Sequence, residues 1–161
     1  MNNEMSDFSI PHVSNAAGFV PSPANFIRPG KRPLSSITPI IAEYPNGDLY
    51  VSIGAAGGSH ITTATLQALW HILDHNMTVA QALAEPRMHD QLLPNVVSFE
   101  WPGRAQRGFD NTTVESMREK GHNVTWVAEG VSAVQGIVRL ANGTFEAAGE
   151  PRQKNSAGYA V

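Results

Sequence analysis

Alternating apolar and polar residues near the middle of the chain predict a β-hairpin. The runs ITPIIAEY and LYVSIG flank PNGD, whose Asn46-Gly47 pair tolerates the positive φ angles that a tight hairpin turn requires. A second pair, Asn142-Gly143, separates VQGIVRL from TFEAAG and predicts another hairpin. VVSFE and HNVTWV have the composition of further strands, so the chain is rich in short strands joined by tight turns.

The segment that begins at about Ser59, HITTATLQALWHILDHN, has the spacing of a helix. One apolar face is formed by residues at intervals of three and four, Ile61, Thr65, Ala68 or Leu69, and Ile72. A second apolar face is formed by Leu66, Trp70 and Leu73. Because the helix is apolar on two sides, we expect it to be buried.

Two capping boxes predict shorter helices. Thr78 with Gln81 opens VAQALAE, and Thr112 with Glu115 opens TVESMREK. The order of elements is a hairpin, two or three helices and then more hairpin strands. This order predicts a mixed α+β fold with an antiparallel sheet rather than repeated βαβ units. Residues 14–30 show little periodicity, and we interpret them as a long ordered loop within a single domain, residues 1–161.

Composition places the chain among globular proteins. Its 161 residues are 42% hydrophobic and 16% charged, which favours a buried core over disorder. The formal net charge is -3 and no basic cluster occurs, so nucleic acid is not an expected partner. No stretch approaches the ~18 apolar residues of a spanning helix, and the first residues show no signal-peptide pattern.

Four Asn-X-Ser/Thr sequons favour passage through the secretory pathway. They are centred on Asn76, Asn111, Asn123 and Asn142. The chain has no cysteine, so redox chemistry gives no information about its compartment. We therefore expect a glycoprotein, with no targeting signal in this chain.

Some residues can be interpreted either as structural residues or as part of a chemical site. Gly57-Gly58 stands between a strand and a helix, where a plain turn is the simpler interpretation and an anion-binding turn the alternative. Ser35 and Ser36 could be turn residues that bond nearby backbone groups. His71 and His75 are four apart on the predicted helix, but no carboxylate lies between them as in a zinc protease motif. We expect a histidine pair in or beside the core, and no metal or cofactor.

Taken in order, several motifs resemble the small subunit of the γ-glutamyltransferases, also called glutathione hydrolases. The resemblance extends from Asn2 nearly to the end of the chain, and the motifs that carry it are NNEMSDF, PGKRPLSS-TP, G-AGGS, EPRMH, EPR and AGYA. Each motif is weak alone, whereas the ordered set is specific to the family.

The resemblance implies an N-terminal-nucleophile hydrolase with a four-layer αββα sandwich built from a large and a small subunit of one precursor. In such enzymes a threonine at the start of the small subunit attacks, and its own α-amine acts as the base. The expected reaction cleaves the γ-glutamyl amide of glutathione and transfers the γ-glutamyl group to water or to an amino acid or peptide. The family also implies an extracellular, secretory or membrane-associated location.

The resemblance also assigns residues to parts of the substrate. Carboxylates suit an ammonium group, paired hydroxyls suit a carboxylate, and backbone N–H groups suit an oxyanion. In that order the assigned residues are Glu4 and Asp7 for the α-amino group, Ser35 and Ser36 for the α-carboxylate, and Gly57 and Gly58 for the oxyanion hole.

The family's threonine-rich nucleophile segment precedes NNEM, whereas this sequence has Met1 directly before Asn2. We therefore expect the chain to hold the substrate-binding and oxyanion half of the site and to be inactive alone. The alternative is a non-catalytic binding or interaction module derived from the same fold. An in-frame threonine-initiated segment upstream would distinguish the two.

Overall fold

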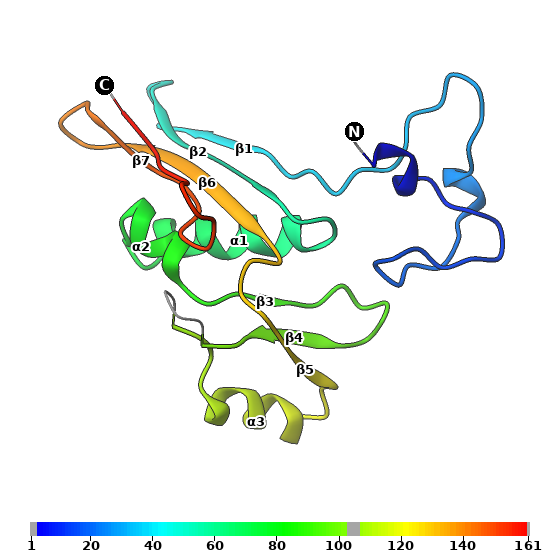
Figure 1. The fold of residues 1–161 in the computed structure, drawn as a ribbon. Helices are drawn as coiled ribbons and strands as arrows, with labels where there is room; N and C mark the ends of the chain where they lie inside the picture. Colours follow the sequence, from blue (N-terminus) through cyan, green and yellow to red (C-terminus); the bar gives the residue numbers. More distant parts are fainter. Residues whose placement is uncertain (1–2, 103–106, 161) are drawn as a thin grey trace.

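The computed structural model describes residues 3–102 and 107–160, and within them the strands form two sheets (Figure 1). The first sheet is antiparallel, in the order β1 (Ile40–Glu43), β2 (Leu49–Ala56), β6 (Ala133–Arg139) and β7 (Phe145–Ala148). The second sheet has the order β3 (Met88–His89), β4 (Val97–Glu100) and β5 (Val124–Val127).

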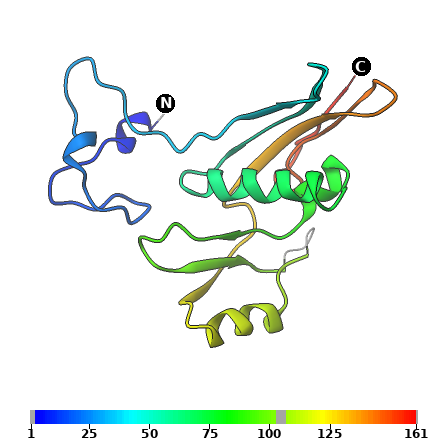
Figure 2. The same cartoon turned by 180° about the vertical axis from the view of Figure 1, so that it is seen from behind.

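Helices α1 (His60–Leu73) and α2 (Val79–Ala84) lie between the two sheets, and α3 (Asn111–Glu119) lies beyond the second sheet (Figures 1 and 2). Residues 3–39, here called the N-terminal segment, extend to one side of these layers (Figures 1 and 2). This segment contains two short 3-10 helices, η1 (Glu4–Asp7) and η2 (Pro23–Asn25). The predicted α+β class is confirmed.

Both predicted hairpins are confirmed. β1 pairs antiparallel with β2, with Ile40 opposite Ile53, and Gly47 in the connecting turn has a φ of +85°. β6 pairs antiparallel with β7, and Gly143 in that turn has a φ of +86°. Positive φ is the condition that made the Asn-Gly pairs informative, because glycine adopts it without a steric penalty.

The main core lies between the first sheet and the two helices. Alternate residues of β2 and β6 point toward α1, as the two-residue period of a strand requires. One apolar face of α1, as predicted, and the inner side of α2 complete the core. Its buried members are Val51, Ile53, Ala64, Ala68, Ile72, Val79, Ala82, Leu83, Val134 and Val138.

The second apolar face of α1 is exposed, so the prediction that both faces are buried is wrong for this chain. Leu66, Trp70 and Leu73 are 61%, 47% and 41% exposed. The apolar pattern of a helix predicts that a face is buried, but it does not show which element of the protein buries that face. Here the two sheets cover the other face.

The second sheet differs from the predicted antiparallel arrangement. β4 and β5 are parallel, and α3 lies between them in sequence, so these elements form a βαβ unit. The predicted capping box of Thr112 and Glu115 is also wrong. Asp110 caps α3 by accepting a hydrogen bond from the Thr113 amide at 2.6 Å, which starts the helix two residues earlier. The capping box of Thr78 and Gln81 is confirmed at α2.

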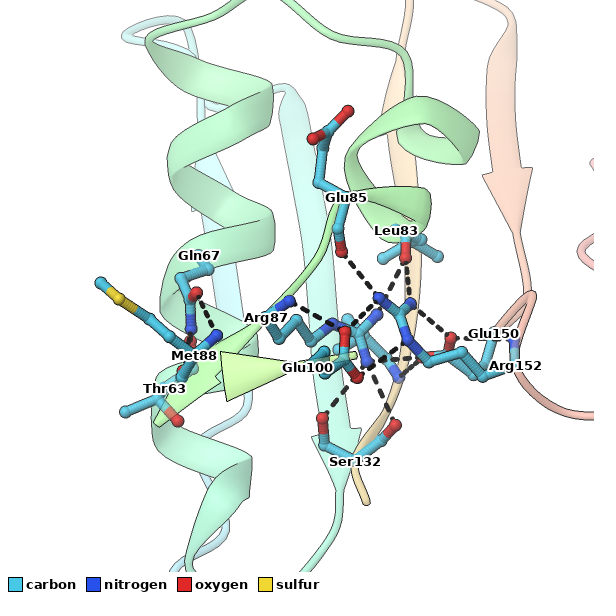
Figure 3. Close-up of polar contacts among 11 residues, drawn as sticks. Thr63, Gln67, Leu83, Glu85, Arg87, Met88, Glu100, Ser132, Glu150 and Arg152 are labelled. Atoms are coloured by element: carbon cyan, nitrogen blue, oxygen red, sulfur yellow. Dashed lines mark hydrogen bonds and ion pairs between the residues drawn. The ribbon is translucent and has the colours of Figure 1, made fainter. Parts of the chain in front are cut away.

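Four buried charged residues connect the two sheets, and we call them the ion cluster: Arg87, Glu100, Glu150 and Arg152 (Figure 3). Glu150 forms ion pairs with Arg87 at 2.8 Å and with Arg152 at 3.0 Å. Glu100 at the end of β4 accepts two hydrogen bonds from Arg152, at 2.7 and 3.0 Å. Each carboxylate also accepts a backbone N–H, Glu100 from Arg87 and Glu150 from Val134.

The arginines of the ion cluster also bind the end of α2. Arg152 donates to the carbonyls of Leu83 and Glu85 at 2.7 Å each, and Arg87 donates to Leu83 at 3.0 Å. The last carbonyls of a helix have no partner within the helix, so these donors satisfy groups that burial would otherwise leave unpaired. The ion cluster therefore fixes α2, β4 and the segment after β7 in one arrangement.

The pKa of Glu150 reflects this setting. Burial raises it, but the Arg87 charge and the hydrogen bonds from Val134, Arg152 and Arg87 outweigh burial, so the pKa is lowered from its ordinary value. Glu150 is therefore a buried carboxylate held in its charged form.

Replacing Glu150 by glutamine should destabilise the fold strongly. The Glu150→Gln variant leaves two buried arginines facing one carboxylate, and losing one partner of a buried ion pair typically costs about 3–5 kcal/mol. The matched control is Glu115→Gln, which breaks the exposed Arg118 pair on α3 and should cost less than about 1 kcal/mol. Urea unfolding of both variants measures the difference. Equal losses would contradict a structural role for the cluster.

The effect of Glu150→Gln should diminish in acid. Because the folded-state pKa of Glu150 is lowered, its contribution to stability is present above the ordinary value of 4.5 and is lost as the pH falls toward the folded-state pKa. The difference in unfolding free energy between wild type and Glu150→Gln should therefore be full at pH 7 and smaller at pH 3. A difference that is constant over this range would refute the charged state assigned to Glu150.

Candidate functional site

The turn between β2 and α1 has an unusual backbone at two successive glycines. Gly57 has a φ of +139° and Gly58 a φ of +59°. A Cβ atom on Gly57 would lie 2.7 Å from the Val131 carbonyl oxygen and 2.8 Å from the Ser132 Cα. Both neighbours are backbone atoms, so they cannot move aside as a flexible side chain could. Gly57 is therefore required by its dihedral angle and by the close approach of residues 131–132.

Ser132 connects this turn to the ion cluster. Arg87 donates to the Ser132 carbonyl at 3.1 Å and to its hydroxyl at 3.2 Å (Figure 3). Since the backbone of Ser132 packs against Gly57, the buried arginine fixes the surface on which the glycine turn rests. Ser59 occupies the N-cap position of α1, but its side chain makes no capping hydrogen bond.

The predicted serine pair lies beside the glycine turn. The Ser36 hydroxyl donates to the Gly58 carbonyl at 2.6 Å. Ser35 is exposed, and its hydroxyl accepts a hydrogen bond from the Ile37 amide at 3.2 Å. Thr38 lies 3.3 Å from Thr62 of α1, measured between the two hydroxyl oxygens. The structure thus brings the Ser35-Ser36 segment and the Gly57-Gly58 turn together across 22 residues of sequence.

The predicted carboxylates, Glu4 and Asp7, lie on η1 and are exposed. Asn25 connects η1 to the serine segment, because its amide donates to the Asp7 carbonyl at 2.7 Å and its oxygen accepts the Leu34 amide at 3.1 Å. Asn25 was not identified from the sequence, since a lone asparagine in an irregular segment has no distinguishing pattern. That all six residues assigned from the family resemblance belong to one site remains a prediction.

A histidine pair lies immediately beyond the glycine turn. His60, the first residue of α1, stacks on His89 of β3 with the ring centres 3.9 Å apart. Burial lowers the pKa of His60, the charge of His89 lowers it further, and the opposing effect of Glu100 is smaller. A hollow of about 10 Å³ borders both rings, which is room for about one water molecule and too little for a substrate.

The other two predicted features concern histidines and sequons. His71 and His75 are edge to face with ring centres 5.4 Å apart, and in residues 3–102 and 107–160 no cluster of three metal-ligating side chains is found. All four sequon asparagines, Asn76, Asn111, Asn123 and Asn142, are exposed, and whether they carry sugar remains a prediction. Across the described residues every helix is too short or too polar to span a bilayer.

Comparison with known proteins identifies relatives over the whole length of the chain. The glutathione hydrolase proenzyme of Arthroderma benhamiae is 55% identical over 161 residues, which is 100% of this chain and 26% of the relative. The glutathione hydrolase of Aspergillus flavus is 45% identical over 159 residues, again 26% of its length. The chain thus spans about a quarter of the length of these curated relatives.

Solved structures give the same result for the fold. The gamma-glutamyltranspeptidase of Pseudomonas nitroreducens, complexed with L-DON, superposes with a TM-score of 0.83 at 31% identity. The match covers 98% of this chain and 79% of that chain. The sequence model of the family described as gamma-glutamyltranspeptidase matches residues 1–160. The chain therefore belongs to the gamma-glutamyltranspeptidase family.

Proposed function

We propose that this chain forms the γ-glutamyl-binding and oxyanion-stabilising part of a γ-glutamyltransferase active site. The substrate class is glutathione and related γ-glutamyl compounds, and the acceptor is water, an amino acid or a peptide. The observation that carries the proposal is the hydrogen bond from Ser36 to the Gly58 carbonyl. It sets two hydroxyls suited to a carboxylate beside a glycine turn suited to an oxyanion.

The two ends of the γ-glutamyl group differ in charge, and so do the two groups of residues. The α-carboxylate is bound by the hydroxyls of Ser35 and Ser36, with Ser36 exchanging its bond to Gly58 for the ligand. The α-ammonium is bound by Glu4 and Asp7, whose carboxylates are exposed on η1. Hydrogen bonds to charged groups are worth roughly 1.5–3 kcal/mol, so the two ends together orient the ligand.

The oxyanion is stabilised at the glycine turn. When a nucleophile adds to the γ-carbonyl, negative charge develops on the carbonyl oxygen, and backbone N–H groups at a helix start are suited to accept it. Gly57 and Gly58 precede α1, and the contact of Gly57 with residues 131–132 restricts the turn before any ligand binds. Such preorganised donors stabilise the transition state without reorganising during the reaction.

The nucleophile in this proposal is a threonine that the family resemblance places outside the matched motifs. Its hydroxyl attacks the γ-carbonyl and its own α-amine takes the proton, which then passes to the departing amine. The resulting γ-glutamyl ester reacts with water or an acceptor amine. A large subunit of the same precursor is the expected partner, and the exposed apolar face of α1, formed by Leu66, Trp70 and Leu73, is a surface that it would cover.

The proposal is tested by assaying the chain alone and after joining it to the remaining region of the Arthroderma benhamiae relative. The joined protein should release p-nitroaniline from γ-glutamyl-p-nitroanilide, and the 161 residues alone should not. Replacing the catalytic threonine of the joined region by alanine should abolish release. A folded joined protein without turnover would favour the non-catalytic module. Comparable turnover by the chain alone would mean that it contains another nucleophile.

Gly57→Ala in the joined protein should lower kcat by about a hundredfold or more, because the added Cβ displaces the turn and losing one oxyanion donor has an effect of that size. The matched control is Gly47→Ala in the β1–β2 turn. Gly47 also has a positive φ, of +85°, but within the described residues a Cβ atom added to it would have open space for 4 Å around. This control should change stability and leave kcat near that of the wild type. Similar kcat values for both variants would argue against an oxyanion role.

A further inference from the structure

A chain of side-chain hydrogen bonds leads from α1 through β3 to the N-terminal segment. The Thr63 hydroxyl lies 2.8 Å from His89 Nδ1, and His89 Nε2 lies 2.8 Å from Gln91 Oε1. Gln91 Nε2 then donates to the Ala17 carbonyl at 2.7 Å and to the Leu93 carbonyl at 2.9 Å. No sequence pattern indicated these hydrogen bonds, because the residues that form them come from separate segments.

The direction of the hydrogen bonds at Gln91 follows from the donors available. Both hydrogens of the Gln91 amide group point to carbonyls, so its oxygen acts as the acceptor and His89 Nε2 carries a proton. The Thr63 hydroxyl has one hydrogen and lies within reach of both the His60 carbonyl, at 3.2 Å, and His89 Nδ1, at 2.8 Å, so it joins the ring to the first turn of α1. Since His89 is 8% exposed and stacks on His60, its ring is fixed by packing as well as by hydrogen bonds.

Ala17, whose carbonyl accepts the hydrogen bond from Gln91, lies in a rigid turn. The Asn15 side chain accepts the amides of Ala17 at 3.1 Å and Phe19 at 3.0 Å. Gly18 has a φ of +84°, and a Cβ on it would lie 2.7 Å from Pro94 Cδ. The turn of residues 15–19 is therefore bonded to Gln91 and packed closely on Pro94.

This contact is a second attachment of the N-terminal segment to the sheets and helices. The first attachment is the hydrogen bond from Ser36 to Gly58 near the end of the segment. Figures 1 and 2 both show the N-terminal segment beside the connection between β3 and β4. Two attachments fix an orientation that a single attachment would leave free to rotate.

We propose that Gln91, oriented by His89, is a positioning residue that holds the N-terminal segment against the connection between β3 and β4. By doing so it sets the distance from the η1 carboxylates to the glycine turn. His89 stacks on the first residue of α1, three residues after Gly57, so the same ring contacts the helix that follows the turn. The expected effect on substrate binding rests on the function proposed above, whereas the attachment of the N-terminal segment does not depend on that function.

The test compares Gln91→Met with Gln67→Met in the joined protein. Methionine keeps the length of glutamine and removes the amide. Gln67 is a matched control because its side-chain amide bonds the backbone of Met88 in β3 and of Thr63 in α1 instead of the N-terminal segment (Figure 3). The measurements are amide hydrogen exchange, read over residues 12–20 and over β2 and β6, together with KM and kcat for γ-glutamyl-p-nitroanilide.

Gln91→Met should speed exchange in residues 12–20 by about fivefold, the effect of losing one net hydrogen bond, and leave β2 and β6 unchanged. It should raise KM severalfold while kcat changes less than twofold. Gln67→Met should leave the exchange of residues 12–20 and KM as in the wild type. Should Gln91→Met fail to fold, Gln91→Glu keeps the shape and still removes the donors to Ala17 and Leu93.

Unchanged exchange in residues 12–20 would overturn the attachment. Faster exchange with an unchanged KM would overturn the positioning role, because the segment would then be loose without affecting binding. A wild-type joined protein without turnover refutes the proposed function instead, and the exchange measurement still decides the attachment.

Discussion

The rest of the fold depends on the neutralisation of four buried charges. Two arginines and two glutamates lie where α2, β4 and the segments beside β6 and β7 meet, and the side chains of Glu150 and Arg152 are fully buried. Desolvating such ions is costly, so the arrangement holds because each charge has an opposite charge and further hydrogen bonds. The geometry is correspondingly strict. These directional bonds restrict how the two sheets are placed relative to one another.

This constraint reaches the candidate site through Ser132. Arg87 fixes Ser132, and the backbone of Ser132 packs on Gly57, so the turn that would stabilise the oxyanion rests on a residue that the ion cluster holds in place. The N-terminal segment is held differently, by individual hydrogen bonds at Ser36 and Gln91. The proposed site therefore joins a rigid part, for the reacting carbonyl, to a more weakly attached part, for recognition of the charged ends.

Local signals in the sequence predicted local structure well. Asn46-Gly47 and Asn142-Gly143 located both hairpins because each three-residue turn ends on a glycine that adopts a positive φ. The ion cluster could not be predicted, since its members are far apart in sequence. One signal was present: the motif Glu-Pro-Arg occurs twice, at 85–87 and 150–152, and three of the four cluster residues come from these two copies.

Other misses have the same physical origin. The parallel pairing of β4 and β5 is a long-range choice that strand propensity does not encode, and the cap at Asp110 competed with an equally plausible Thr112. For the candidate site, the family motifs supplied the six residues, and the structure showed the contact between Ser36 and Gly58. Asn25 and Gln91 lie outside the family motifs and act through contacts between distant segments, whereas His89 ends the motif EPRMH without a role that the motif could indicate.

A crystal structure of the joined protein with bound glutamate would decide whether the six residues form one γ-glutamyl site. We expect the α-carboxylate of glutamate within hydrogen-bond distance of the Ser35 and Ser36 hydroxyls, and the α-ammonium beside Glu4 and Asp7. The γ-carboxyl should face the backbone N–H groups of Gly57 and Gly58. Glutamate bound elsewhere, or bound with its α-carboxylate away from both serines, would contradict the proposed site.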